Sequence, residues 1–148
     1  MKLSTRSTYG LRALIELGLA EGRGPLSAAR IAGRQDLSVA YLEQLLHRLK
    51  KQGLVSSIRG PKGGYLLAKE PEQVTVAEIV RVLDGAAAAP NGRSKDSSRH
   101  AQRIAHAVYR CVHERLNSSL DEVTLKDLCN EVQELAGEPL DHRYVFHI

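Results

Sequence analysis

Apolar residues in the first third of the chain repeat every three or four positions, which is the spacing of one helix face. Three segments show this repeat, at residues 5–21, 28–34 and 38–52. Ser27 precedes the second segment and Ser38 opens the third. A serine at such a position accepts a hydrogen bond from a free backbone N–H of the first helical turn. The pattern therefore predicts three helices in close succession.

The pattern then changes to two short β-favouring runs around a glycine-rich turn. Residues 53–67 read GLVSSIRGPKGGYLL, which is typical of a β-hairpin. We expect Gly60, Gly63 and Gly64 to adopt positive φ angles and to allow a close backbone approach. Two helices followed by such a hairpin are the order of a winged helix-turn-helix, in which the hairpin is the wing.

Further helical patterns follow the hairpin. Residues 75–78 read Thr-Val-Ala-Glu, which matches a capping box, and they open a helix that ends before Gly85. Another short helix is predicted over residues 124–135. Residues 86–98 contain Ala, Pro, Asn-Gly and Ser, a composition that is typical of a flexible linker.

The longest periodic element spans residues 98–118. Its apolar positions are Ala101, Ile104, Val108, Val112 (or Cys111), Leu116 and, further on, Leu120. A helix of this length cannot bury the whole stripe on a small winged domain, so we expect it to pair with the same helix of a second subunit.

These elements predict a mainly α chain with a small β-hairpin wing, that is, a winged helix-turn-helix plus a long dimerisation helix. The expected division is a DNA-binding domain at residues 1–85, a flexible linker at 86–98, and the dimerisation helix and C-terminal region at 99–148. At 148 residues the chain has room for one such domain with an attached dimerisation element.

Charge is divided unevenly along the chain. Residues 1–69 hold 12 Lys and Arg against 4 Asp and Glu, a net charge of +8, whereas residues 70–148 have a net charge of −4. The basic half coincides with the winged-helix pattern, as expected of a DNA-contacting face. The chain lacks a long apolar run, a catalytic nucleophile–base pattern and a phosphate loop. We therefore expect a cytoplasmic DNA-binding protein that is not an enzyme and does not bind membranes.

The third helix is expected to enter the major groove, where residues of its first turns read base edges. The candidates are Ser38, Ala40, Tyr41 and Gln44, although Ser38 could serve only as a cap and Tyr41 could pack under the wing or hold a phosphate. At the wing tip, Arg59 is the candidate for the minor groove and Lys62 for a phosphate. The expected phosphate contacts are Lys2, Thr5, Arg6, Ser7, Tyr9, Arg48 and Lys51, whereas Arg12 and Arg34 are either solvated or paired.

Several segments together resemble the Rrf2 family of bacterial transcription regulators. They are MKLSTR at 1–6, YGLRA at 9–13, LSVAYLEQL at 37–45, GLV at 53–55, RG at 59–60, GGY at 63–65, VAEIV at 76–80, LDG at 83–85 and TLKDL at 124–128. The resemblance covers nearly the whole chain outside residues 86–100. It implies a homodimer that binds a pseudo-palindromic operator in double-stranded DNA.

Many members of this family hold an iron–sulfur cluster through three closely spaced cysteines before the long helix. This chain departs from that pattern, because its two cysteines are Cys111 and Cys129 and residues 86–105 contain none. His106 lies near a position that is a ligand in some relatives, but one imidazole cannot hold a cluster. We predict that the protein has no cofactor and no metal, with an iron–sulfur or redox-sensing regulator as the alternative.

The cluster-free branch that the chain resembles most is that of the cysteine-metabolism repressors, which share a similar C-terminal ending. This resemblance implies control of sulfur or cysteine genes, with O-acetylserine sulfhydrylase as a possible co-repressor that captures a C-terminal isoleucine. Tyr144, Phe146 and Ile148 are then the candidate partner-binding residues. Alternatively, this tail covers the dimer core, or the protein acts mainly as an inhibitor of the sulfhydrylase.

Overall fold

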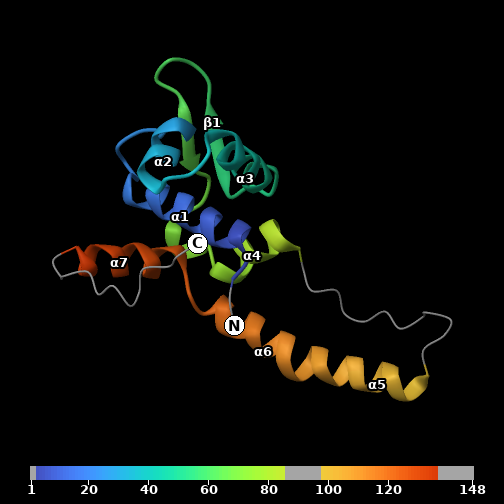
Figure 1. Cartoon of the computed structure of the whole chain (residues 1–148). Coiled ribbons are helices and arrows are strands. Elements are labelled where there is room, and N and C mark those ends of the chain that lie inside the picture. Colours follow the sequence, from blue (N-terminus) through green and yellow to red (C-terminus); the bar gives the residue numbers. More distant parts are fainter. Residues whose placement is uncertain (1–2, 86–97, 137–148) are drawn as a thin grey trace.

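The computed structural model describes residues 3–85 and 98–136 of the chain. A body of four helices and a hairpin is followed by a long helix, and a last short helix packs back against α1 of the body (Figure 1). The elements are α1 (Thr5–Leu19), α2 (Ala28–Gln35), α3 (Val39–Lys51), β1 (Val55–Ile58), β2 (Gly64–Leu67), the 3-10 turn η1 (Pro71–Gln73), α4 (Val76–Asp84), α5 (Arg99–Val108), the π turn η2 (Tyr109–His113), α6 (Glu114–Asp121) and α7 (Leu125–Leu135). The predicted mainly α fold with a hairpin wing is confirmed.

The three predicted N-terminal helices form, and each begins at a serine cap. The hydroxyl oxygens of Ser4, Ser27 and Ser38 each accept a hydrogen bond from the backbone N–H three residues later. The expected stripe of α3 is buried in the core and consists of Leu42, Leu45, Leu46 and Leu49. Helix α1 ends at Leu19, two residues before its predicted end, and the chain then turns through Gly22 with a φ of 80°.

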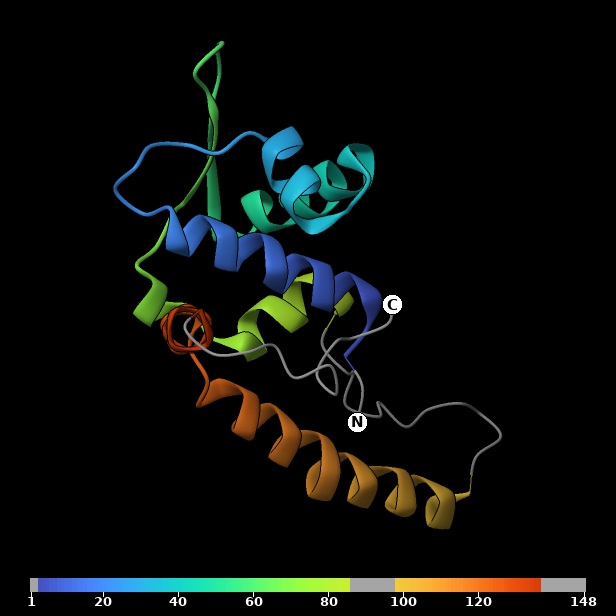
Figure 2. The same cartoon turned by 60° about the vertical axis from the view of Figure 1, so that its left-hand side comes forward.

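The hairpin pairs β1 and β2 in antiparallel register, with Val55 opposite Leu67 and Ile58 opposite Gly64. A third backbone segment joins it, because Leu26 and Tyr65 exchange two hydrogen bonds of 3.1 and 2.7 Å. The wing is therefore anchored to the segment before α2 and projects beyond the body (Figure 2).

The glycines of the wing have different roles. Gly60 and Gly64 have positive φ angles of 114° and 149°, as expected. The same expectation is wrong for Gly63, whose φ is not positive. Gly63 is needed for space instead, since a Cβ there would collide with the carbonyl oxygen of Ile58. Its N–H closes the tip by donating to Gly60 O over 2.9 Å.

The capping box expected at α4 is only half formed. Thr75 Oγ1 accepts a hydrogen bond from Glu78 N at 3.2 Å, but the Glu78 carboxylate accepts from Lys69 Nζ at 3.1 Å. Lys69 therefore binds the Glu78 carboxylate, which the sequence pattern assigned to the backbone N–H at the start of the helix. The two-sided capping box occurs at α7, where Thr124 and Asp127 bond to each other's backbone N–H groups.

The predicted long helix extends from Arg99 to Asp121 and contains the π turn η2 at its middle. Its apolar residues stand four apart, at Ile104, Val108, Val112, Leu116 and Leu120. On an α-helix a four-residue spacing drifts about 40° around the axis at each step. A π turn contains more residues than an α turn and so offsets this drift, which keeps the stripe on one side.

The long helix lies on the opposite side of the body from the wing (Figures 1 and 2). Within the described residues, no helix is long and apolar enough to cross a bilayer. The predicted linker, apart from Ser98, and the tail with Tyr144, Phe146 and Ile148 lie outside the described residues, as does Lys2.

Candidate nucleic-acid interface

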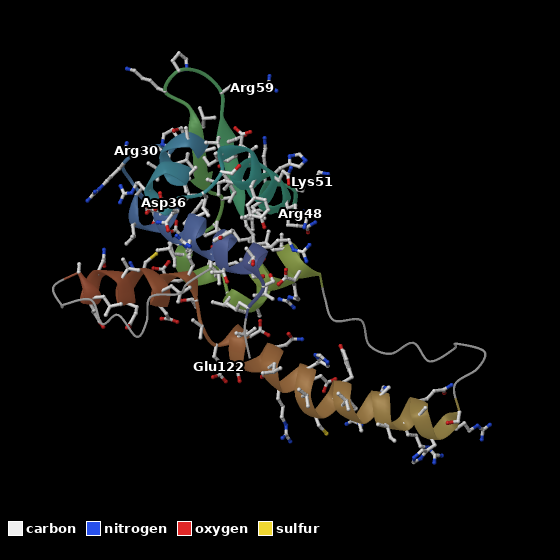
Figure 3. All side chains as sticks on the ribbon, viewed as in Figure 1. Arg30, Asp36, Arg48, Lys51, Arg59 and Glu122 are labelled. Atoms are coloured by element: carbon white, nitrogen blue, oxygen red, sulfur yellow. The ribbon has the colours of Figure 1, made fainter. Side chains whose placement is uncertain are left out.

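Helix α3 turns a polar face to solvent at the wing side of the body. Ala40, Gln44, Arg48 and Lys51 are exposed along this face, and Figure 3 shows Arg48 and Lys51 pointing outward. Ser38 Oγ accepts a hydrogen bond from Tyr41 N at 3.3 Å, so Ser38 is a cap. Its hydroxyl hydrogen is still available to a DNA acceptor.

The structure places Tyr41 against α1 and not under the wing. The rings of Tyr9 and Tyr41 meet edge to face with their centroids 5.9 Å apart, and both side chains are half-buried. The Arg12 guanidinium lies 5.4 Å above the Tyr9 ring and donates to Gln35 Oε1 at 2.8 Å. Arg34 pairs with Glu16 at 3.2 Å. Of the two readings open for Arg12 and Arg34, the paired one is correct.

The wing tip carries two exposed cations. Arg59 and Lys62 have no ion-pair partner among the described residues, and Figure 3 shows Arg59 at the outer end of the hairpin. At the base of the wing, Lys50 Nζ donates to Ser57 Oγ at 2.6 Å. This bond connects α3 to β1, so the wing and the exposed face of α3 keep a defined relative position.

Ser7 does not belong to the interface, and its expected role as a phosphate contact is wrong. The side chain is fully buried, and its hydroxyl donates to Asp84 Oδ2 at 2.6 Å. A hydroxyl that is buried and already bonded cannot reach a DNA phosphate. Thr5 and Arg6, in the same turn, are exposed, although Arg6 Nε also lies 3.3 Å from Asp84 Oδ1.

Arg48 has a second contact that the pattern did not reveal. Its Nη1 donates to the carbonyl oxygen of Leu83 at 3.2 Å, which connects α3 to the end of α4. The side chain remains exposed at the surface. This bond holds the guanidinium in position and leaves its other nitrogens at the surface.

Two exposed residues near this face were missed by the sequence interpretation. Val39 follows the cap of α3 and is 41% exposed, although it is apolar. An apolar side chain there suits the C5-methyl group of thymine. Arg30 projects from α2 on the same half of the body (Figure 3). The position of Val39 directly after the Ser38 cap was the available signal.

The two cysteines lie in different environments. Cys129 is buried in the core, where its Sγ lies 3.9 Å from the Ile15 carbonyl oxygen, whereas Cys111 is exposed in η2. Burial raises the pKa of the Cys129 thiol, and Glu21 adds to this rise while Lys126 opposes it. The described residues contain no group of three His, Cys, Asp or Glu side chains that could hold a metal ion.

Comparison with known proteins supports a single family. The model of the Rrf2 family, described as an iron-dependent transcriptional regulator, matches residues 3–131. The transcriptional regulator IscR of Photorhabdus laumondii is 37% identical over 140 residues, which cover 93% of this chain and 85% of the relative. IscR of Klebsiella pneumoniae is 37% identical over 145 residues, covering 96% of this chain and 89% of the relative.

Solved structures give the same result. CymR, the global cysteine regulator of B. subtilis, is 40% identical with a TM-score of 0.67 over 88% of this chain and 98% of that chain. IscR of T. potens is 38% identical with a TM-score of 0.74 over 97% of this chain and 96% of that chain. The winged-helix fold and the match to the family model over residues 3–131 lead to the same conclusion. The chain belongs to the Rrf2 family of transcriptional regulators.

Proposed function

We propose that this protein is a homodimeric, sequence-specific repressor that binds a pseudo-palindromic operator. The observation that carries the proposal is the combination of an exposed polar face on α3 with two wing-tip cations that form no ion pair within residues 3–85 and 98–136, on a wing anchored beside that face. Base edges are read by Ser38, Ala40, Tyr41 and Gln44, and the wing contributes Arg59 and Lys62. Phosphates are held by Lys2, Thr5, Arg6, Tyr9, Arg48 and Lys51.

The long helix supports the homodimer. Ile104, Val108 and Val112 are 54%, 49% and 48% exposed on one side of it. Such a row of apolar side chains at regular spacing is suited to a second copy of the same helix. In this arrangement residues 1–85 form the DNA-binding domain and residues 99–148 form the dimerisation region.

We further propose that the protein works without an iron–sulfur cluster and controls sulfur or cysteine genes. The positions of Cys111 and Cys129 support the first part, and the similarity to the cysteine regulator CymR supports the second. The similarity to IscR favours the alternative of an iron–sulfur or redox-sensing regulator. For that alternative, a second subunit would have to supply ligands that one chain lacks.

The regulatory partner in this proposal is O-acetylserine sulfhydrylase, bound through Tyr144, Phe146 and Ile148. A terminal carboxylate next to an isoleucyl side chain offers an anion and an apolar group to a site built for an amino acid. Deleting Ile148 should abolish sulfhydrylase binding in isothermal titration calorimetry. Unchanged binding would exclude this partner mode, and inhibition of the enzyme without DNA binding would favour the inhibitor alternative.

Two alanine variants test the proposed base contacts and the proposed phosphate contacts separately. Gln44→Ala should relax sequence preference, costing about 1–3 kcal/mol on the operator and little on unrelated DNA. Lys51→Ala should weaken binding to both duplexes and lower the salt slope by about one. Fluorescence anisotropy titrations measure both quantities. Equal effects of Gln44→Ala on operator and unrelated DNA would contradict the assignment of α3 as the reading helix.

A further inference from the structure

The carboxylate of Asp84, the last residue of α4, accepts hydrogen bonds from three side chains at the start of α1. Ser4 Oγ lies 2.6 Å from both carboxylate oxygens of Asp84, and Ser7 Oγ donates to Oδ2 at 2.6 Å. Arg6 Nε donates to Oδ1 at 3.3 Å. The side chain of Asp84 is 22% exposed. A single acidic group therefore holds a turn that is 77 to 80 positions away in the chain.

The residue beside Asp84 joins two more elements at the same place. The Leu83 carbonyl accepts from Arg48 of α3, and the Leu83 side chain is buried. Gly10 of α1 packs so closely on Leu83 that an added Cβ would collide with it. Helices α1, α3 and α4 thus meet at Leu83 and Asp84.

The three hydrogen bonds to the Asp84 carboxylate differ in length and in exposure to solvent. The Ser7 hydroxyl is fully buried and its bond is short, whereas Arg6 is half-exposed and its contact is longer. Partial burial by itself raises the pKa of Asp84, but the hydrogen bonds from Ser4, Ser7 and Arg6 outweigh it and lower the pKa. These hydrogen bonds therefore favour the ionised form of the carboxylate. An exposed ion pair such as Arg6–Asp84 exchanges easily, since it is worth only about 0–1 kcal/mol.

We propose that Asp84 is a positioning residue for DNA binding, which anchors the first turn of α1 so that Thr5 and Arg6 meet the phosphate backbone. This inference rests on the proposed function of that turn as a phosphate contact. On binding, Arg6 exchanges the carboxylate for a phosphate while Ser4 and Ser7 keep their bonds. A negative charge beside DNA opposes binding by itself, so positioning is what accounts for a carboxylate at this place.

Asp84→Asn tests this inference, because it keeps the shape of the side chain and removes the charge. Asp127→Asn is the matched control, since Asp127 also accepts from the start of a helix, but its helix α7 packs against the later part of α1, at Ile15 and Gly18, and not against the first turn. We expect Asp84→Asn to weaken operator binding about tenfold and to lower the salt slope by one to two units, corresponding to one or two lost phosphate contacts. Asp127→Asn should leave both quantities unchanged. Circular dichroism and thermal unfolding identify a temperature at which both variants are folded.

The inference is decided by whether Asp84→Asn weakens or strengthens DNA binding. Removing a negative charge would by itself strengthen DNA binding, and a partly unfolded protein would bind less without a change in salt slope. Unchanged or tighter binding by Asp84→Asn would overturn the inference. If this variant does not fold, Ser7→Ala removes one of the anchoring bonds and should give a smaller loss of affinity with a smaller fall in salt slope. Failure of the wild-type protein to prefer its operator would instead overturn the proposed function.

Discussion

Substitution of glycine by alanine should have opposite effects on stability at Gly10 and at Gly33, because the two residues have different surroundings. A Cβ at Gly10 would collide with the buried side chain of Leu83, whereas Gly33 lies in α2 with open space around it. We predict that Gly10→Ala destabilises the fold by about 1–3 kcal/mol through overpacking. Gly33→Ala should stabilise it by about 0.5–1 kcal/mol, because alanine favours helices. Urea unfolding measures both, and equal effects would contradict the packing described here.

The two cysteines should differ sharply in reactivity. Cys111 is exposed, whereas Cys129 is buried and burial raises the pKa of its thiol, so little reactive thiolate is present at neutral pH. We predict that a thiol-alkylating reagent at pH 7 modifies Cys111 and leaves Cys129 intact until the protein unfolds. Peptide mass spectrometry reads both sites, with Cys111→Ser as the control. Rapid native labelling of Cys129 would contradict its burial and would favour the alternative of a redox-sensing regulator.

Residue roles were predictable where the partner is local. The cap at Ser38 follows from its place before a helical pattern, and its acceptor bond joins positions three apart. The role of Ser7 was not predictable, because its partner Asp84 lies 77 positions away. Tyr41 also depends on a contact with another helix, the one to Tyr9 of α1. Spacing along one segment carries no information about such contacts.

At the scale of elements, periodicity located all the predicted helices and the wing, but not how they join. The order of helices and hairpin follows from apolar spacing and turn residues. The backbone bridge between Leu26 and Tyr65 has no periodic signal, since it joins an irregular segment to a strand. The π turn η2 was also missed. The four-residue spacing of the stripe from Ile104 to Leu120 was its available sign.

Helix α4 connects the two functional parts of the described chain. Thr75, the N-cap of α4, and Arg81, in its last turn, lie 3.5 and 3.8 Å from Asp121, the last residue of α6. Asp84, the last residue of α4, holds the first turn of α1. One rigid helix therefore runs between the long helix and the elements that we propose contact DNA.

At the scale of the whole molecule, the basic segment of the chain and the long helix lie on different sides of the body. The segment with a net charge of +8 contains α1, α3 and the wing, and the long helix lies on the opposite side of the body (Figure 2). DNA and the second subunit can therefore be bound on different sides of the molecule. The charge division was visible in the sequence, whereas the opposite placement of the two parts required the tertiary structure.

The exposed stripe gives a prediction for the assembly. Val108→Glu places a charge among apolar side chains that we propose are buried between two copies, so it should convert the dimer to a monomer. Val132→Glu is the matched control, because Val132 is 38% exposed on α7, outside the stripe. Light scattering coupled to size-exclusion chromatography measures the molecular mass. A dimer that survives Val108→Glu would contradict the proposed interface.

The affinity of the metal-free protein for its own upstream DNA, compared with its affinity for a scrambled duplex, shows whether the protein is a cluster-free, sequence-specific regulator. Fluorescence anisotropy across a salt series measures both affinities and their salt dependence. We predict that the specific duplex is bound about a thousandfold more tightly or better, with a steep fall in affinity as salt rises. Equal, weak binding to both duplexes, restored only when an iron–sulfur cluster is reconstituted, would contradict a cluster-free regulator.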